Sequence, residues 1–576
     1  MATKVHKVRY YNPKPRSINC VCYNKKQKHL ALSREDASIE VWDLNHAPFL
    51  LKSIPGVENG SIEALGWASN RLFSTGLGGA LLEWDLEELS LKTSVALTGY
   101  AAWCLDVNPF STTVAVGTEQ GYINLFSVSN NELVYEKLFD KQEGRIMCCK
   151  FDNTGNILVT GSINTIRVWN VETGHATARI SASRRGKETI IWCLGVLSDN
   201  TIISGDNLGR LTFWDSTMGE QIETFTVHKA DILAIAVSDD EKSVYCSGVD
   251  PVIVNFVKVD VNNKTQNAQW VKNIQRHIHE HDIRALVLQG EKLLSAGADG
   301  YLTFSSYPPK WVMRIPPMLP MPRSSVCPSK KLLLMRYINH IDIWKLGKYA
   351  TKPNGKLVVH NINKKYRAGQ PKKETESNIE RDSVINAANI HKSKGIQTLE
   401  LAEKPSKIAS IHTKGNKQMK YCEMSPDGQY IMYSTDTDLR ILKLELDEEE
   451  EMNASLSKVL INGLNVKSCE QAVFTEDAQT LILYSKSNLY VLQLDPQSGA
   501  ELSQTIETNK SVAVQPNKGT TYLVAADSSS AIGVWLKSSK RTFEPYIALP
   551  KYKCVPSALA INSTGTSIVI AYVDQK

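Results

Sequence analysis

A six-residue pattern recurs along this chain, and its spacing restricts the possible folds more than any other feature of the sequence. Each copy reads apolar, any residue, apolar, aromatic, polar, apolar, which is the alternation of a half-buried β-strand. The clearest copies are IEVWDL (39–44), LLEWDL (81–86), INLFSV (123–128), IRVWNV (166–171) and LTFWDS (211–216). Their aromatic residues are 42, 42, 43 and 45 positions apart. This regular return of one strand predicts a repeat protein with one small structural unit per period.

Two more apolar runs come before each copy, and both end in small or turn-forming residues. Before Trp42, for example, these runs are INCVCYN and HLALSREDAS. The rest of each period is rich in turn residues and has room for a fourth strand. Four short antiparallel strands in about 40 to 45 residues, with Trp-Asp near the end of the third, are typical of a WD-repeat propeller blade. The sequence therefore predicts an all-β protein made of tandem WD-repeat β-propellers.

The aromatic residue of each copy is interpreted as a packing residue rather than a ligand-binding one. A single four-stranded blade cannot cover both of its faces, so it is stable only between two neighbours in a closed ring. Indole rings on the third strand are large enough to fill the space between blades. The residues assigned to this structural role, with the aspartates that follow three of them, are Trp42, Asp43, Trp84, Asp85, Trp169, Trp214 and Asp215.

Two histidines ahead of apolar strands are also assigned a structural role. His228 and His279 each lie four residues before an isoleucine that opens such a strand. This is the spacing of the WD-repeat histidine that hydrogen-bonds within its own blade. His279 also belongs to HIHEHD (277–282), in which alternating histidines on one face of a strand could ligate zinc. We favour the structural role and predict neither a metal site nor a cofactor.

Seven copies of the pattern occur up to residue 307, which predicts a seven-bladed propeller over residues 1–309. The seventh copy shows only three strands before a Pro-Pro pair, which ends a strand pattern. We therefore expect VHKVRYY (5–11), near the N-terminus, to supply the missing outer strand and close the ring. The Pro-rich residues 310–325 would then connect this ring to the next domain.

A second propeller is expected over residues 326–576. Its copies of the pattern lie near residues 344, 442, 492 and 535, and a polar, basic insertion at about 348–416 interrupts the first of them. The closing SIVIAYVDQK matches a second strand with its turn, but no third strand follows it. We therefore expect this propeller to be incomplete because the chain is truncated, which would leave strand edges open.

The charge of the chain is mildly basic, with 66 Lys and Arg against 60 Asp and Glu, and it is unevenly distributed. Between residues 352 and 394 there are ten basic and four acidic side chains. Such a segment is either a solvated insertion or a basic arm that becomes ordered on RNA or on a partner. The candidate contacts are Lys364, Lys365, Arg367, Lys372 and Lys373, with Arg184 and Arg185 as a second basic loop.

Motifs for catalysis and membrane insertion are missing from the sequence. There is no G-x-x-x-x-G-K-[ST], H-E-x-x-H or G-x-S-x-G, and no apolar run approaches a bilayer-spanning length. The eleven cysteines lie mostly in apolar, strand-like runs, as expected of buried free thiols in a reducing compartment. Because the opening residues have no apolar block, we expect an intracellular protein. Because the catalytic motifs are missing, we expect a protein that is not an enzyme and takes no small-molecule substrate.

Several longer stretches resemble one family of WD-repeat proteins. KVHKVRYYNPKPRSINCVCYN, RLFSTGLGGALLEWDLEEL, ETIIWCLGVLSDNTIISGDNLGRLTFWDSTMGE and INHIDIWKLG are similar to the cirhin family. The resemblance implies a nucleolar, non-catalytic scaffold of the small-subunit processome that acts in pre-rRNA processing and is linked to rDNA transcription. It implies other processome proteins and the 5′ external transcribed spacer of the pre-ribosomal RNA as partners. It leaves direct and protein-mediated RNA contact both open.

A substrate receptor of a cullin ubiquitin ligase is the alternative function, since WD-repeat proteins often have that role. Such receptors often carry an arginine two residues after Trp-Asp to bind their adaptor. The three Trp-Asp contexts here are WDLN (42–45), WDLE (84–87) and WDST (214–217), and none has that arginine. The sequence therefore favours the processome scaffold.

If the basic candidates contact RNA directly, binding will be independent of sequence and will weaken as salt is added. We expect substitution of Lys364, Lys365, Arg367, Lys372 and Lys373 by glutamate to reduce the affinity for single-stranded RNA and to flatten its salt dependence. A titration of labelled RNA at several salt concentrations measures both. An unchanged affinity would leave protein contacts as the means of recruitment.

Overall fold

The structure is a computed structural model in which β-strands are the main regular elements. The residues that it describes are 16–56, 60–183, 188–262, 265–306, 310–317, 324–337, 339–348, 357–358, 384–385, 402–417, 419–435, 437–446, 454–495, 499–508, 511–516, 522–527, 529–538, 542–562 and 565–574. Apart from strands, these ranges hold two short 3-10 turns, η1 (Ser129–Asn131) and η3 (Lys414–Asn416). The predicted all-β class is confirmed.

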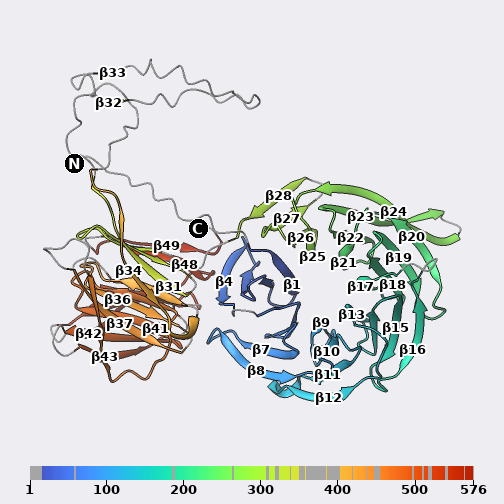
Figure 1. Ribbon diagram of the computed structural model, residues 1–576, viewed down its shortest axis with the longest axis horizontal. Coiled ribbons are helices and arrows are strands. Elements are labelled where there is room, and N and C mark those ends of the chain that lie inside the picture. The colour runs from blue at the N-terminus through green and yellow to red at the C-terminus, as the bar shows by residue number, and fades with distance from the viewer. Residues whose placement is uncertain are drawn as a thin grey trace. The chain divides into compact units, whose positions relative to one another are not determined.

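Two compact units make up the chain. Unit 1 consists of Met1–Pro320 with Tyr572–Lys576, and unit 2 of Met321–Ala571. Within the described residues, unit 1 holds seven four-stranded antiparallel sheets in chain order, as predicted for a seven-bladed propeller. Figure 1 shows these sheets, coloured from blue to green, arranged around a common axis.

Each sheet of unit 1 runs in chain order from an inner to an outer strand. The first three sheets are β1 (Ile18–Asn24), β2 (His29–Arg34), β3 (Ile39–Asp43), β4 (Phe49–Ile54); β5 (Ala64–Ala68), β6 (Arg71–Thr75), β7 (Ala80–Asp85), β8 (Ser90–Ala96); and β9 (Ala102–Val107), β10 (Thr113–Thr118), β11 (Ile123–Ser127), β12 (Val134–Leu138). The next two are β13 (Cys148–Phe151), β14 (Ile157–Gly161), β15 (Thr165–Asn170), β16 (Ala176–Ser181); and β17 (Ile191–Val196), β18 (Thr201–Asp206), β19 (Arg210–Asp215), β20 (Gln221–Thr226). The last two are β21 (Ile232–Val237), β22 (Ser243–Gly248), β23 (Val252–Asn262), β24 (Thr265–His277); and β25 (Ile283–Gln289), β26 (Lys292–Gly297), β27 (Leu302–Ser306), β28 (Trp311–Ile315).

The tryptophans of the third strands lie between neighbouring sheets. Trp84 packs in one cluster with Ile39 and Val41 of the sheet before it. Trp169 packs in the same way against the third sheet and Trp214 against the fourth. Because Trp169 is completely buried, its whole indole surface contributes to the contact between sheets. The periodic aromatic residue is therefore the main apolar link from one blade to the next.

Side-chain packing closes the ring of unit 1. Trp42 of the first sheet packs in one cluster with Leu302 and Phe304 of the seventh. The guanidinium of Arg34 adds a hydrogen bond of 3.2 Å to the carbonyl oxygen of Gly300. No strand is exchanged between these two sheets in the described part of the chain, because each sheet is continuous in sequence.

The outer strand of the seventh sheet differs from the expectation. Trp311–Ile315 forms β28 and pairs with β27, although it falls in the segment 310–325 that the sequence assigned to a connection. The first strand of unit 2 also begins inside that segment, at Ser324. An outer strand has one face and one edge in water, so WVMRI lacks the continuous apolar signal of the inner strands. The segment VHKVRYY (5–11), expected to supply this strand, lies outside the described residues.

Cysteine and glycine form close pairs on the inner strands of the third, fourth and fifth sheets. A β-carbon at Gly117, Gly161 or Gly205 would lie 2.6 Å from the sulfur of Cys104, Cys148 or Cys193, respectively. Only glycine therefore fits opposite each thiol. Burial raises the pKa of Cys148 and Cys193 well above the ordinary thiol value. All eleven cysteines are free, so these thiols act as small apolar residues.

Unit 2 contains the four sequence repeats expected in it. Its sheets are β29 (Ser324–Cys327), β30 (Leu332–Arg336), β31 (His340–Lys345), β34 (Ser406–His412); β35 (Tyr421–Met424), β36 (Tyr430–Ser434), β37 (Leu439–Leu446), β38 (Ala454–Val459); β40 (Gln471–Phe474), β41 (Thr480–Ser485), β42 (Asn488–Asp495), β43 (Gly499–Glu507) with the short parallel β39 (Ile461–Asn462) at the edge; and β44 (Ser511–Pro516), β45 (Tyr522–Asp527), β46 (Ile532–Lys537), β47 (Phe543–Leu549). Two-stranded sheets are formed by β48 (Pro556–Ile561) with β49 (Ile568–Tyr572), and by β32 (Leu357–Val358) with β33 (Val384–Ile385).

The insertion predicted at 348–416 is too long at its C-terminal end. Ser406–His412 forms β34, which pairs with β31 as the outer strand of the first sheet of unit 2. Most residues of this strand are half-buried or exposed. Its sequence SKIASIH therefore mixes polar and apolar residues and lacks the apolar run of an inner strand. At the C-terminal end of the chain, β48 and β49 form a two-stranded sheet after the fourth repeat. The sequence predicted that this last repeat has no third strand. No helix in the described ranges has the length and hydropathy needed to cross a bilayer.

The packing of Trp169 generates a stability prediction. We expect Trp169→Ala to lower the free energy of unfolding of unit 1 by about 3–5 kcal/mol, because it removes a buried indole and leaves a cavity between two sheets. Trp311→Ala is the matched control, since Trp311 lies on an outer strand and is 39% exposed. It should cost about 0.5 kcal/mol. Urea unfolding of both variants measures the difference, and equal losses would contradict the proposed role of the buried indole.

Candidate partner-binding face

The basic residues singled out in the sequence all lie in segments outside the described residues. Lys364, Lys365, Arg367, Lys372 and Lys373 lie outside the described residues, and so do Arg184 and Arg185. Their contact with RNA stays a prediction of the sequence. Other residues form a candidate site on two kinds of loop in unit 1, one joining the second strand of a blade to the third and one joining an outer strand to the next inner strand.

The aspartates of the Trp-Asp pairs belong to hairpin turns. The carboxylate oxygen Oδ1 of Asp43 accepts a hydrogen bond of 2.8 Å from the backbone N–H of Asn45. Asp85 and Asp215 make the same contact two residues ahead, at 2.7 and 2.8 Å. Hydrogen bonds from the Thr217 hydroxyl and backbone lower the pKa of Asp215. These contacts shape the turn between the third and fourth strands.

The tryptophan N–H groups donate to hydroxyl groups on the neighbouring second strand. The Nε1 of Trp84 donates to Ser74 Oγ at 2.8 Å, and that of Trp214 donates to Ser204 Oγ at 2.8 Å. Trp169 donates to Thr160 Oγ1 at 2.9 Å. Trp42 differs, because its N–H reaches the carboxylate of Glu40 at 3.0 Å. Each buried indole therefore has a polar partner within its own sheet.

The two predicted histidines lie in two of the three sheets of unit 1 whose third strand carries phenylalanine in place of tryptophan. His279 is 1% exposed, and its ring nitrogens lie 2.8 Å from Asp299 Oδ2 and 2.8 Å from Ser295 Oγ. Burial raises the pKa of Asp299, but the hydrogen bond and charge of His279 outweigh it, so the pKa of Asp299 is lowered. All three residues belong to the seventh blade.

His228 makes a weaker set of contacts in the sixth blade. Its Nδ1 is 3.8 Å from Asp250 Oδ2, and its Nε2 is 4.0 Å from the sulfur of Cys246. Neither His277 nor His281 joins His279 in a ligand set, since no three His, Cys, Asp or Glu side chains in the described ranges are placed to hold a metal ion. The HIHEHD motif therefore supplies one blade histidine.

In the fourth blade a glutamine occupies the position of these histidines. Gln142 lies four residues before Ile146, just as His228 and His279 precede their isoleucines. It is 2% exposed, and its Oε1 accepts a hydrogen bond of 3.2 Å from Thr160 Oγ1. The Nε2 of Gln142 is buried and has no hydrogen-bond partner among the described residues. Leaving such a donor unpaired costs about 1–3 kcal/mol, so this atom is a signal of function.

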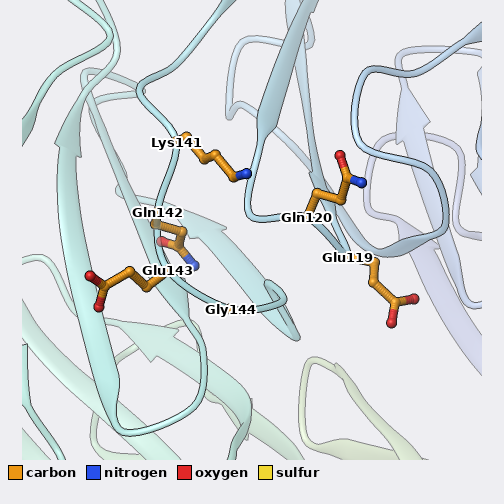
Figure 2. A pocket seen from close by; sticks show the side chains of 6 residues that line it. All are labelled: Glu119, Gln120, Lys141, Gln142, Glu143 and Gly144. Carbon is orange, nitrogen blue, oxygen red and sulfur yellow. The ribbon is translucent and has the colours of Figure 1, made fainter.

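A pocket of about 490 Å³ opens beside Gln142, between the third and fourth blades. Figure 2 shows the six lining residues on two facing loops; they are Glu119, Gln120, Lys141, Gln142, Glu143 and Gly144. The first loop joins β10 to β11, and the second joins β12 to β13. The sequence analysis missed this pocket, although the four-residue spacing before Ile146 would have singled out Gln142.

Main-chain contacts hold the two loops of the pocket together. The backbone N–H of Gln142 donates to the carbonyl oxygen of Gly121 at 2.9 Å, and that of Ile146 donates to Thr118 at 3.1 Å. Gly121 has a φ of +85°, and a β-carbon there would lie 2.1 Å from the Gln142 carbonyl oxygen. Only glycine permits this close approach. The pocket floor is therefore fixed by the backbone.

The charges around the pocket leave one cation without a carboxylate partner. Glu119 pairs with Arg145 at 3.3 Å, and Glu143 pairs with Arg179 at 3.7 Å. Lys141 makes no ion pair with a described residue, and its Nζ lies 5.3 Å from the centre of the Tyr122 ring. Figure 2 shows its side chain extending toward the loop that carries Gln120. The pocket therefore presents one unpaired ammonium group and one buried amide donor.

Two indoles lie near the inner end of the same face. Trp103 and Trp192 both sit at β-bulges in the innermost strands of their sheets. Trp192 Nε1 donates to Asp231 Oδ2 at 2.9 Å. Trp103 Nε1 is buried without a partner, and the Arg145 guanidinium lies 5.7 Å from the centre of its ring. Arg145 thus links the pocket to the inner strands.

Repeated four-stranded sheets, packed through third-strand tryptophans, define a tandem WD-repeat β-propeller protein. The family described as "WD domain, G-beta repeat" matches residues 134–170, which comprise β12 and the first three strands of the next blade. The chain is 29% identical, over its full length, to a Homo sapiens protein named U3 small nucleolar RNA-associated protein 4 homolog and covers 79% of that protein. It is 28% identical to the Mus musculus homolog, with the same coverage. It is 22% identical to U3 small nucleolar RNA-associated protein 4 of Saccharomyces cerevisiae, over 99% of this chain and 72% of that protein.

The burial of His228 generates a pH prediction. Desolvation lowers the pKa of His228, although the charge of Asp250 opposes this. Below a pH of about 6.5 the unfolded chain gains a proton at this residue that the folded chain resists, so stability falls as the pH falls. We expect the melting temperature of His228→Gln to fall less than that of the wild type when the pH is lowered from 7.5 to 5.5. His281→Gln, at an exposed position, serves as the control. Thermal melts at both pH values give the drop in melting temperature of each protein. An equal drop in the wild type and in both variants would contradict the prediction.

Proposed function

We propose that this protein is a non-catalytic scaffold of the small-subunit processome and acts in nucleolar pre-rRNA processing and small-subunit biogenesis. One observation carries the proposal. The chain is similar along its full length to proteins named for association with U3 small nucleolar RNA. The partners proposed are other processome proteins and the pre-ribosomal RNA, and the proposed location is the nucleolus.

The fold supports this role because propellers offer several separate surfaces. The seven sheets of unit 1 bury their faces against each other, so their loops and outer strands are left to bind partners. The alternative of a cullin ligase receptor has no supporting observation. The residues two positions after Trp-Asp are Asn45, Glu87 and Thr217, and all three already make turn contacts, with Asp43, Asp85 and Asp215.

The proposal is tested by depletion of the protein in cells. We expect unprocessed precursors of small-subunit rRNA to accumulate and the protein to co-sediment with pre-ribosomal particles. Northern blotting with probes in the 5′ external transcribed spacer measures the precursors, and re-expression of the wild-type chain is the control for specificity. Normal precursor levels after depletion would overturn the proposal.

A further inference from the structure

The hydrogen-bonded network of the fourth blade ends at Gln142, whose Nε2 donor has no partner among the described residues. In the seventh blade, the corresponding His279 uses both ring nitrogens, on Asp299 and Ser295. In the fourth blade only one side of Gln142 is used, on Thr160. Gln142 is itself one of the residues that line the pocket between the third and fourth blades. The same position therefore completes a network in one blade and leaves a donor free in another.

The orientation of the Gln142 amide follows from its neighbours. An indole N–H only donates, so Trp169 Nε1 makes Thr160 Oγ1 an acceptor at 2.9 Å. Thr160 Oγ1 in turn donates its proton to the amide oxygen of Gln142 at 3.2 Å. The amide nitrogen consequently faces away from Thr160, where it has no partner. Trp169, Thr160 and Gln142 thus form one buried hydrogen-bonded chain within the fourth blade.

The charges select the ligand. Glu119 and Glu143 are paired with Arg145 and Arg179, whereas Lys141 has no carboxylate partner among the described residues. These two acids and three bases leave a local excess of one positive charge. One carboxylate would pair with Lys141 and accept from the Gln142 amide. A nucleic-acid backbone would bring several phosphates against a wall that also holds two carboxylates, so a single acidic side chain fits better.

The loop that carries these donors can admit such a group. Gly144 has a φ of +78°, and no atom lies within 4 Å of the position of its β-carbon. The residues on either side of the loop are held by the backbone hydrogen bonds of Gln142 and Ile146. A small outward movement at Gly144 would uncover the Gln142 amide without breaking those bonds.

We infer that the pocket between the third and fourth blades binds an aspartate or glutamate side chain from a segment of a partner protein. Lys141 pairs with its charge, and Gln142 Nε2 donates to its second oxygen. The inference rests on the proposed scaffold function, since it names the chemistry by which one partner is held. It assigns no role to the basic residues that the sequence singled out.

The binding test uses the purified full-length chain and a displayed library of twelve-residue peptides. We expect the selected peptides to share an acidic residue at one position and to lose affinity when that residue becomes its amide. Lys141→Glu and Gln142→Glu should each weaken the best peptide about tenfold or more in fluorescence anisotropy. Gln142→Glu keeps the acceptor for Thr160 but turns the donor into an acceptor. Lys229→Glu, on the equivalent loop of the sixth blade, should leave the affinity unchanged.

Each outcome of the binding test either supports or contradicts the binding of an acidic side chain in the pocket. Melting curves show whether Gln142→Glu folds, and if it does not, the exposed Lys141→Glu decides alone. Peptides without a shared acidic residue, or an affinity that both variants retain, would overturn the inference. A twelve-nucleotide oligouridylate that loses binding in Lys141→Glu while the peptides do not would assign the pocket to RNA and also overturn it.

The level of rRNA precursors in cells distinguishes a failure of the pocket inference from a failure of the proposed scaffold function. Cells depleted of the protein and supplied with Lys141→Glu report on the pocket, whereas cells supplied with no protein report on the scaffold. Normal rRNA precursors in the first and accumulated precursors in the second would leave the scaffold in place without the pocket. We expect accumulation in both, with less of it in cells that express the variant.

Discussion

The fold depends on one constraint, which is that a four-stranded sheet has two apolar faces and no means of covering either. Each sheet of unit 1 meets this constraint by packing against its two neighbours, and the first and seventh sheets meet in one cluster around Trp42 and Phe304. The ring is closed by side chains alone in the described part of the chain. Stability is therefore spread over a set of similar contacts, each centred on an aromatic residue of a third strand.

The polar networks beneath these contacts are divided among the blades. The blades with Trp84, Trp169 and Trp214 satisfy the indole with a serine or threonine, while those with His228 and His279 have phenylalanine at the aromatic position. The fourth blade combines tryptophan with a buried glutamine at the histidine position. That combination orients the Gln142 amide and creates a donor that the blade itself does not use. A variation in the repeat has thus produced a feature that the average repeat lacks.

The sequence predicted the inner three strands of each blade well and the outer strand poorly. Inner strands are covered on both faces, so they read as apolar runs, and their aromatic residues recur at a fixed interval. Outer strands such as Trp311–Ile315 and Ser406–His412 have an edge and one face in water, so their residues are mixed and were assigned to a connection and an insertion. The pocket was missed because Glu119 and Lys141 are on different repeats, and nothing in a periodic pattern shows which loops face each other.

The sequence by itself determined the repeat, the strand that carries each tryptophan, the number of blades in the first ring and the resemblance to processome proteins. The repeat, the strand of each tryptophan and the number of blades follow from local alternation and spacing, whereas the resemblance rests on longer stretches such as RLFSTGLGGALLEWDLEEL. Only the tertiary structure decided which sheets pack together at the ring closure, which loops line one pocket, and which atom of Gln142 has no partner. Those results depend on distances between residues far apart in the chain, and such distances exist only once the backbone has folded.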